Sequence, residues 1–473
     1  MLQSFALAFV AFAAVGTAIA IASRKMGVRT LRDYYVAGGR MGALLAFGAY
    51  AATTYSAFMM VGLVGLAYQT GSGALGFELL YLLSTVVLLA TVGRTAWALS
   101  KRRGWSAPSQ MLGDLYGSGA LAKAAAIVYL LSLVPYTAAQ IIGIGSIFEA
   151  FGVGYGLGVA VGAALSFAWL AIAGMWSVAT TDLYQAIVML AGGLAYFSWI
   201  VASVASAMGL PEAASRLGEA GYLGITRFWT PSAFLAYTIP WAFFAITNPQ
   251  VVARLYVHVD EKAYRRSTIY FAFYGFLYTL LSVGVGLLAR ALALGGLLPG
   301  NLARDSVTPA LLLRAPDWLS ALVAVSIVAA ALSTINGIVM GVSSSLVKAF
   351  SASETVGVAV AVDALLSALA GLLAYLRAGY IVDLSVLSSV LLLPFAPVTL
   401  AGLVLERERL AGARHFALAA IAVGALGGFA AFVTVGPAGT FTAAPLGLPV
   451  PAWILLASTL VLLAGLTRGG HHR

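Results

Sequence analysis

The sequence LLAFGAYAATTYSAFMMVGLVGLAYQTG, residues 44–71, is the most informative part of the chain for its architecture. The stretch is apolar over more than the roughly 20 residues that one straight helix needs to cross a bilayer. Its middle nevertheless holds a run of polar side chains, Thr53, Thr54, Tyr55 and Ser56. Polar groups and freed backbone at membrane depth are tolerated only where protein or a water-filled cavity surrounds them. The stretch therefore predicts a transmembrane helix that is interrupted at its centre.

The rest of the chain has the composition of a polytopic membrane protein. Of its 473 residues, 62% are hydrophobic and 9% are charged, and the mean hydropathy is +0.98. A soluble globular chain carries about 25% charged residues, so this balance excludes a soluble enzyme. Apolar runs predict an all-α protein of about 13 transmembrane helices, at residues 2–22, 42–69, 75–99, 122–150, 154–175, 182–208, 233–253, 268–296, 317–349, 355–376, 380–405, 413–436 and 449–467.

A second apolar stretch is also interrupted. FLAYTIPWAFFAITNPQVVARLYV, residues 234–257, contains Pro240 and Pro249, and each proline removes a helical hydrogen bond. The two interrupted stretches are the second and seventh predicted spans, five apart, and so occupy corresponding positions in two halves of five helices. Such a pair indicates an inverted-repeat transporter with a binding site near the bilayer midplane.

We expect one membrane domain over residues 1–473. An extra helix and a loop occupy residues 1–41, the inverted-repeat core occupies 42–405, and two further helices occupy 406–473.

The net charge of +10 reflects membrane topology and gives no reason to expect a nucleic-acid partner. When the 26 Lys and Arg residues are assigned to the loops between predicted spans, 20 fall on one face of the membrane and 6 on the other. Because cytoplasmic loops carry the excess of Lys and Arg, the N-terminus is predicted outside and the C-terminus in the cytoplasm. We therefore expect a multi-pass protein of the cell membrane, surrounded by the lipid bilayer.

The ninth predicted span carries the clearest candidate for an ion site. In VAAALSTINGIVMGVSSSLVKAF, residues 328–350, a backbone carbonyl at Ala330 and the hydroxyls of Ser333 and Thr334 lie at i, i+3 and i+4, on one helix face. Uncharged oxygens suit a dehydrated monovalent cation such as sodium. The alternative is that these hydroxyls bond to their own helix or join neighbouring helices, which is also our interpretation of Ser343, Ser344 and Ser345.

Acidic side chains within apolar spans indicate function, because they are costly in a membrane. Glu78 either faces a binding cavity or reaches the interface. Asp182 begins the sixth predicted span, where a first-turn acid would also favour the helix dipole. Asp363 lies well inside a span, and the sequence does not indicate its partner. Glu149 lies at the edge of a span.

Several other kinds of site are missing from the sequence. The chain has no Cys, no phosphate-binding loop with Lys followed by Ser or Thr, and no zinc-type His pair within a span. These absences exclude a pump driven by ATP bound to this chain. We expect no enzymatic activity and no cofactor other than a coupling ion.

From about residue 30 to 415 the chain resembles the sodium:solute symporter family. The resemblance rests on six stretches in the family's order: LRDYYVAGGRMG (31–42), TTYSAFMMVGLVGLAYQTG (53–71), VPYTAAQIIGIGSIFEAFG (134–152), AGMWSVATTDLYQAIVML (173–190), NPQVVARLYVHVDEKAYRRS (248–267) and AAALSTINGIVMGVSSSLVKAF (329–350). The resemblance implies a five-plus-five inverted repeat of the leucine-transporter type, formed here by spans 2–6 and 7–11.

The resemblance also implies roles for single residues. The family's sodium site would use the carbonyls of Ala52, Tyr55 and Ala330 with the hydroxyls of Ser333 and Thr334. Asp182 matches an aspartate on the sodium path toward the cytoplasm. Residues at substrate-side positions are Phe77, Glu78, Gln140 and Asn248.

Two departures from the family pattern bear on the solute. Phe58 and Met59 stand where sugar carriers have an acidic residue and a Gln, which disfavours a sugar. Thr54 stands where proline carriers have an Asp, which disfavours proline. We expect a symporter that imports sodium and an amino acid or small organic acid by alternating access. A proton-coupled transporter that uses Asp363 or Glu78, and a sodium symporter for a vitamin or sugar, are the alternatives. A sensor or channel would be expected to carry a signalling domain or pore loop.

Cysteine labelling tests the predicted orientation, because the background contains no Cys. The positive-inside rule places Arg40, Arg102 and Arg254 in the cytoplasm and Arg216 and Arg304 outside. In intact cells, a membrane-impermeant thiol reagent should label the Arg216→Cys variant and leave Arg102→Cys unlabelled until the cells are permeabilised. Labelling of Arg102→Cys in intact cells would overturn the orientation.

Overall fold

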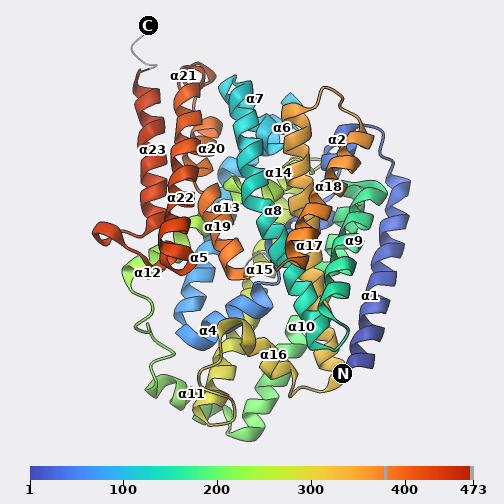
Figure 1. Cartoon of the computed structure of the whole chain (residues 1–473), viewed down its shortest axis with the longest axis vertical. Coiled ribbons are helices and arrows are strands. Elements are labelled where there is room, and N and C mark those ends of the chain that lie inside the picture. The colour runs from blue at the N-terminus through green and yellow to red at the C-terminus, as the bar shows by residue number, and fades with distance from the viewer. Residues whose placement is uncertain (378–380, 469–473) are drawn as a thin grey trace.

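The protein is a bundle of long helices (Figure 1). The computed structural model describes residues 1–377 and 381–468. Within these residues, helices are accompanied only by one isolated bridge between Met41 and His258, so the predicted all-α fold class is confirmed. The start of α1 and the end of α23 lie at opposite ends of the molecule (Figure 1), as an odd number of crossings requires.

The first half of the chain contains eleven α-helices: α1 (Leu2–Ala22), α2 (Leu31–Val36), α3 (Ala43–Thr54), α4 (Val64–Thr70), α5 (Gly73–Leu88), α6 (Arg94–Arg103), α7 (Pro108–Tyr116), α8 (Gly119–Ala150), α9 (Tyr155–Ala173), α10 (Met175–Ala207) and α11 (Leu210–Glu219). Two π-helices, η3 (Met59–Leu63) and η4 (Leu89–Gly93), precede α4 and α6. Short 3-10 helices are η1 (Ser23–Met26) and η2 (Ala37–Gly39).

The described part of the second half contains α12 (Pro231–Ala242), α13 (Phe244–Thr247), α14 (Pro249–Leu255), α15 (Glu261–Leu294), α16 (Val307–Leu312), α17 (Asp317–Phe350), α18 (Val356–Tyr375), α19 (Ile381–Leu392), α20 (Phe395–Val404), α21 (Arg407–Gly412), α22 (Arg414–Thr442) and α23 (Val450–Arg468). Two 3-10 helices, η5 (Arg304–Ser306) and η6 (Pro445–Gly447), lie in its loops.

Eleven of the described helices are long and apolar enough to cross a bilayer, and the bent pair Ala43–Thr54 and Met59–Thr70 makes a twelfth candidate. Residues Pro231–Thr247 form a shorter apolar helix. The exact number of 13 spans therefore stays a prediction. The start of the eleventh predicted span, residue 380, lies outside the described residues.

The first predicted interruption is present. Helix α3 ends at Thr54, Tyr55 adopts an extended conformation with φ −94° and ψ 96°, and the chain resumes as the π-helix η3. The two halves are bent by 54°. The polar run that begins at Thr53 thus coincides with the break, because its backbone leaves the helical hydrogen-bond pattern there.

The second interruption is also present, but it does not lie at Pro240, which is inside α12. The helix breaks first at Phe243 and again at Asn248, whose φ of −92° and ψ of 114° are extended. Pro249 then occupies the first turn of α14, where its missing N–H removes no helical bond.

Helix α17 is the centre of the bundle. Its apolar window is 94% buried, whereas those of the peripheral α1, α18, α22 and α23 are at most 28% buried. It packs against both interrupted helices, through α3 and α14, and against α8 and α10. Large apolar side chains on outer helices, such as Leu7 and Phe273, are each 73% exposed, as expected for helices that face lipid.

Two glycines let the interrupted helices approach α17. A Cβ added at Gly337 would collide with the Thr53 side chain of α3. A Cβ added at Gly341 would lie 2.9 Å from the Gln250 backbone nitrogen and 3.1 Å from the Pro249 carbonyl carbon of α14. Small residues allow helix backbones to pack closely in membranes, so these glycines fix the breaks against one side of α17.

The face that carries most Lys and Arg, called the basic face below, is closed by the loop that precedes α3. A capping box starts α2, in which Asp33 N–H donates to Thr30 Oγ1 at 3.0 Å. Burial raises the pKa of Asp33, but hydrogen bonds from Thr30 and Arg29 and the charge of Arg40 outweigh it and lower the pKa. Main-chain bonds then join Met41 to the loop after α14.

An Ala substitution at Gly341 should destabilise the protein by about 1–3 kcal/mol, because the added methyl meets backbone that cannot rotate away. Gly337→Ala should have a smaller effect, since it meets a side chain. The measurement is thermal unfolding of the purified proteins. The control is Gly427→Ala on α22, which has nothing within 4 Å and should lose no stability. Equal melting temperatures for Gly341→Ala and the control would contradict this packing.

Candidate functional site

The break in the first interrupted helix brings a cluster of uncharged oxygens onto α17. Because α3 ends at Thr54, its last backbone hydrogen bond runs from Tyr55 N–H to the Ala51 carbonyl, and the Ala52 carbonyl has no helical partner. Ser333 Oγ donates to the Ala52 carbonyl at 2.8 Å and lies 3.0 Å from the Ala330 carbonyl. Thr334 Oγ1 donates to the same Ala330 carbonyl at 2.9 Å. All four residues are buried. The structure therefore brings together four of the five predicted sodium ligands.

The fifth predicted ligand, Tyr55, lies at the C-cap of α3. No hydrogen bond joins its carbonyl to Ser333 or Thr334 in the described residues, so its place beside them follows only from its position three residues after Ala52. Its ring is stacked on Phe271 with a centroid distance of 5.7 Å, which holds this residue inside the bundle.

The four oxygens have the chemistry of a site for a dehydrated monovalent cation. Both hydroxyls donate to carbonyls in this arrangement, yet a hydroxyl oxygen has two lone pairs and its hydrogen can rotate. Ser333 and Thr334 would then offer oxygen lone pairs beside the Ala52 and Ala330 carbonyls. The same contacts also fit the alternative interpretation, because Thr334 bonds to its own helix and Ser333 joins α17 to the neighbouring α3.

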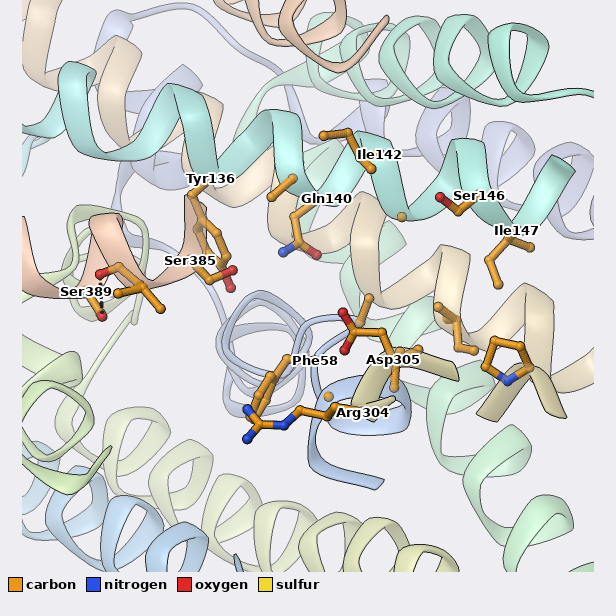
Figure 2. A pocket seen from close by; sticks show the side chains of 18 of the residues that line it. Phe58, Tyr136, Gln140, Ile142, Ser146, Ile147, Arg304, Asp305, Ser385 and Ser389 are labelled. Carbon is orange, nitrogen blue, oxygen red and sulfur yellow. Dashed lines mark hydrogen bonds between the residues drawn. The ribbon is translucent and has the colours of Figure 1, made fainter. Parts of the chain in front are cut away.

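A cavity of about 710 Å³ adjoins the same interruption (Figure 2). Three of the predicted substrate residues line it: Phe58, Phe77 and Gln140. Phe58 is stacked on Trp241 of the second interrupted helix at 6.0 Å. Gln140 is 3% exposed, and its Oε1 has no hydrogen-bond partner among the described residues. The cavity thus has an aromatic wall and an unused amide oxygen.

The other three predicted substrate residues do not line this cavity. Met59 is buried at the start of η3. Glu78 is 2% exposed, and within the described part of the chain its carboxyl has no hydrogen bond or ion pair. The Asn248 side-chain oxygen accepts a hydrogen bond from Thr247 at 2.9 Å. Their roles stay predictions. Phe58 and Phe77, which directly precede Met59 and Glu78, form the aromatic wall together with Trp241.

Several residues of the cavity were not among the predicted site residues. Tyr136 lies one helical turn before Gln140 on α8, so their spacing was the available signal. Arg304 and Asp305 come from η5, in the loop between α15 and α17, and also line the cavity. From the sequence, Arg304 entered only the prediction of membrane orientation. The residues near it in the chain do not indicate that this loop folds over the interrupted helices.

The cavity extends to the face opposite the basic face. Its outer lining includes Tyr155 and Arg377, at the start of α9 and just after the end of α18. Arg377 Nη2 donates to both carboxylate oxygens of Glu149, at 3.0 and 3.1 Å, and its guanidinium lies 3.9 Å from the centroid of the Tyr155 ring. Glu149 is therefore an ion-pair partner at the cavity mouth.

On the basic face, Asp363 has a partner that the sequence did not indicate. Tyr34 of α2 donates to Asp363 Oδ2 at 2.6 Å. The neighbouring Tyr35 hydroxyl lies 2.8 Å from Ser343 Oγ on α17. Both tyrosines are buried, so α2 is bonded to α17 and α18 across the end of the bundle.

Asp182 does not cap a helix. Helix α10 begins at Met175, so Asp182 lies about two turns inside it and the first-turn interpretation is wrong. Its Oδ2 lies 3.6 Å from Arg254 Nη2 of α14 and accepts a hydrogen bond from Thr53 at 3.4 Å. Both charged residues are fully buried. Thr53 follows Ala52 directly, so this ion pair adjoins the oxygen cluster on its basic-face side.

Two interrupted helices around one central helix, an oxygen cluster at the break and a cavity beside it define a membrane transporter. The profile of the sodium:solute symporter family matches residues 34–419, and the chain belongs to this family. The fold and the family are those of transporters, and the protein is a multi-pass membrane protein.

One relative matches over a shorter region. The uncharacterized symporter YodF of Bacillus subtilis (strain 168) is 28% identical over 169 residues, which are 36% of this chain. The match spans 34% of YodF, about a third of that protein's length.

Solved structures share the fold. A Na⁺-coupled sialic acid symporter in a substrate-bound outward-open state has a TM-score of 0.82 at 17% identity, over 99% of this chain and 98% of its own. MHP1, a nucleobase-cation-symport-1 family transporter, has a TM-score of 0.57 at 15% identity, over 92% and 94%. MhsT in complex with L-phenylalanine has a TM-score of 0.56 at 12% identity, over 91% and 99%. At these identities the likeness establishes the fold, which is of the predicted leucine-transporter type.

Replacing Asp182 by Asn should destabilise the protein by about 3–5 kcal/mol, because it leaves the buried Arg254 guanidinium without its anion. The double variant Asp182→Asn with Arg254→Gln should recover part of that loss in thermal unfolding. The control is Arg216→Gln, which removes an exposed pair with Glu212 and should change stability by at most about 1 kcal/mol. If Asp182→Asn were as stable as the control, the buried pair would have no structural role.

Proposed function

We propose that the protein is a secondary active symporter that imports sodium together with an amino acid or small organic acid. One observation carries this proposal. The four-residue interruption between α3 and η3 has the oxygen cluster at Ala52 on one side and the cavity wall at Phe58 on the other. A cation that fixes this segment also fixes the wall of the solute cavity. Binding of the ion and of the solute is then coupled through a few residues of backbone.

The cavity is open toward one face of the membrane and closed toward the other, which supports import by alternating access. The cavity reaches the face with few basic residues, which we propose is the outside of the cell membrane. The basic face, which we propose is cytoplasmic together with the C-terminus, is closed by the Tyr34–Asp363 bond and the main-chain bonds of Met41. An outside-open cavity with a closed cytoplasmic end is the state that accepts sodium and solute before the helices rock.

The composition of the cavity supports a small solute with an acidic group. Phe58 and Trp241 form an aromatic wall, and the same cavity also holds polar side chains such as Gln140. Arg304 lines the cavity, and a guanidinium is well suited to bind a carboxylate. These features favour an organic anion or an amino acid.

Proton coupling is the second candidate, and the burial of Glu78 favours it. Its carboxyl is enclosed near Tyr55 and Tyr81 without a described hydrogen bond. Uptake that requires a pH gradient and is equal in sodium and choline would select this function. It would also contradict sodium coupling.

Removing both hydroxyls, as Ser333→Ala with Thr334→Ala, should abolish sodium-driven uptake while the protein stays folded. Each lost ligand weakens binding by about 1–3 kcal/mol, so sodium affinity should fall by about one to four decades. The fold should survive, because interhelical hydrogen bonds in membranes average about 0.6 kcal/mol. The measurement is the sodium dependence of thermal stability and of uptake in proteoliposomes.

The matched control is Ser326→Ala with Ser344→Ala. These hydroxyls lie on the same helix and bond only to α17 itself, to Val323 and Gly341. This variant should keep the sodium dependence of the unmodified protein. Unchanged sodium dependence in the Ser333–Thr334 double variant would show that the ion site lies elsewhere.

Coupling is reciprocal, so sodium and solute should strengthen each other's binding by the same factor.

A further inference from the structure

The loop between α15 and α17 is fixed against both interrupted helices. Gln69 of α4 donates to the Leu302 carbonyl at 3.0 Å, and Thr308 donates to the Met60 carbonyl of η3 at 2.5 Å. Arg304 Nη2 donates to the Tyr237 hydroxyl of α12 at 3.2 Å. A Cβ at Gly65 would collide with the Arg304 carbonyl, so η5 lies directly on α4. The loop is thus part of the cavity wall.

Two side chains of opposite charge reach from this loop into the cavity. Figure 2 shows Arg304 and Asp305 on the side of Phe58, across from Gln140 and Tyr136 of α8. Within the described residues, neither forms an ion pair with the other or with any further charged group. The third charged residue of the described lining, Arg377, is paired with Glu149. Arg304 and Asp305 are therefore the charges that the described cavity leaves for a ligand.

We propose that the solute is a zwitterion whose carboxylate binds Arg304 and whose ammonium group binds Asp305. This inference rests on the proposed function and narrows its solute class to amino acids and related betaines. A carboxylate without an amine would face the Asp305 anion, and an amine without a carboxylate would face the Arg304 cation; each would leave one charge uncompensated. A zwitterion compensates both.

Arg304 and Asp305 are consecutive in the chain, and both line the cavity that contains the aromatic wall. A single ligand bound in this cavity can therefore contact both side chains. The remainder of the solute would lie against the Phe58 and Trp241 rings. These aromatic faces suit an apolar side chain, and they also suit methyl groups on a quaternary ammonium.

Ligand binding to the purified, full-length protein tests the inference. The probes are the twenty amino acids and glycine betaine, the matched acids that lack the amine, the matched amines that lack the carboxylate, and neutral sugars. Binding is measured by thermal stabilisation and by calorimetry, in sodium and in choline. We expect stabilisation by one or more zwitterions in sodium, and at most weak stabilisation by the single-charge analogues of the same compounds.

Two variants assign the charges. Arg304→Gln and Asp305→Asn should each weaken the zwitterion by about 10- to 100-fold, as expected when a charged partner is lost. In Arg304→Gln, the matched amine should bind as well as the zwitterion. In Asp305→Asn, the matched acid should do so. If Arg304 and Asp305 only stabilised the fold, their substitution would not change which of the matched compounds binds best. The controls are Arg216→Gln and Glu212→Gln on α11, a pair outside the cavity lining.

Three results would overturn the inference: no zwitterion in the panel stabilises the protein in sodium, a single-charge analogue binds as tightly as its zwitterion, or both variants bind like the controls. Failure of the proposed function would give different experimental results. Zwitterion binding that depends on Arg304 and Asp305 but is equal in sodium and choline supports the inference and contradicts sodium coupling. Sodium-dependent uptake of an organic acid that has no amine contradicts only the inference.

Discussion

A backbone carbonyl at membrane depth must have a partner, and the structure is organised around the partner that Ala52 finds. Helix α3 stops inside the bundle, so the carbonyls from Ala52 onward lose their helical donors. The Ser333 hydroxyl, brought 2.8 Å from the Ala52 carbonyl, replaces one of them. This contact requires that α17 be central, that Gly337 be small, and that α3 end at this depth. The same oxygens, which carry no full charge, are collected in one place and form the site that we propose for a cation.

Among the described residues, the charged side chains on the basic-face side of this oxygen cluster form an ion pair, whereas Arg304 and Asp305 on the other side do not. Toward the basic face, Asp182 and Arg254 form a fully buried pair at 3.6 Å, and Thr53 links the aspartate to the end of α3. A buried pair whose geometry is this loose gives little net stability by itself. Asp182 lies next to the cluster and is paired with Arg254 of the second interrupted helix, and this position supports our proposal that Asp182 lies on the inward path of the ion. Toward the other face, Arg304 and Asp305 remain available to a ligand.

Both interrupted helices therefore line the same cavity. The first supplies Phe58, the second supplies Trp241, and their rings are stacked. The loop that carries Arg304 and Asp305 bonds to both of them. A movement of the first interrupted helix relative to α17 changes both the oxygen cluster and the aromatic wall, because Ala52 and Phe58 both belong to this helix. This physical linkage is what coupling between an ion and a solute requires.

Local patterns in the sequence predicted the helical class, the two interruptions and the i, i+3, i+4 oxygens of α17, because each depends on residues within a few turns of one another. The same local patterns misplaced the start of α10 and so assigned Asp182 to a helix terminus, since polar residues from Ser177 onward look like a loop until their burial is known. Only the tertiary structure decided which distant groups meet. Tyr34 and Asp363 are 329 residues apart in the chain, and Ser333 and Ala52 are 281 apart. No local property of a residue encodes such a contact, because the contact arises from how the helices pack. Packing also placed Arg304 and Asp305 at the cavity and left Glu78 outside its lining.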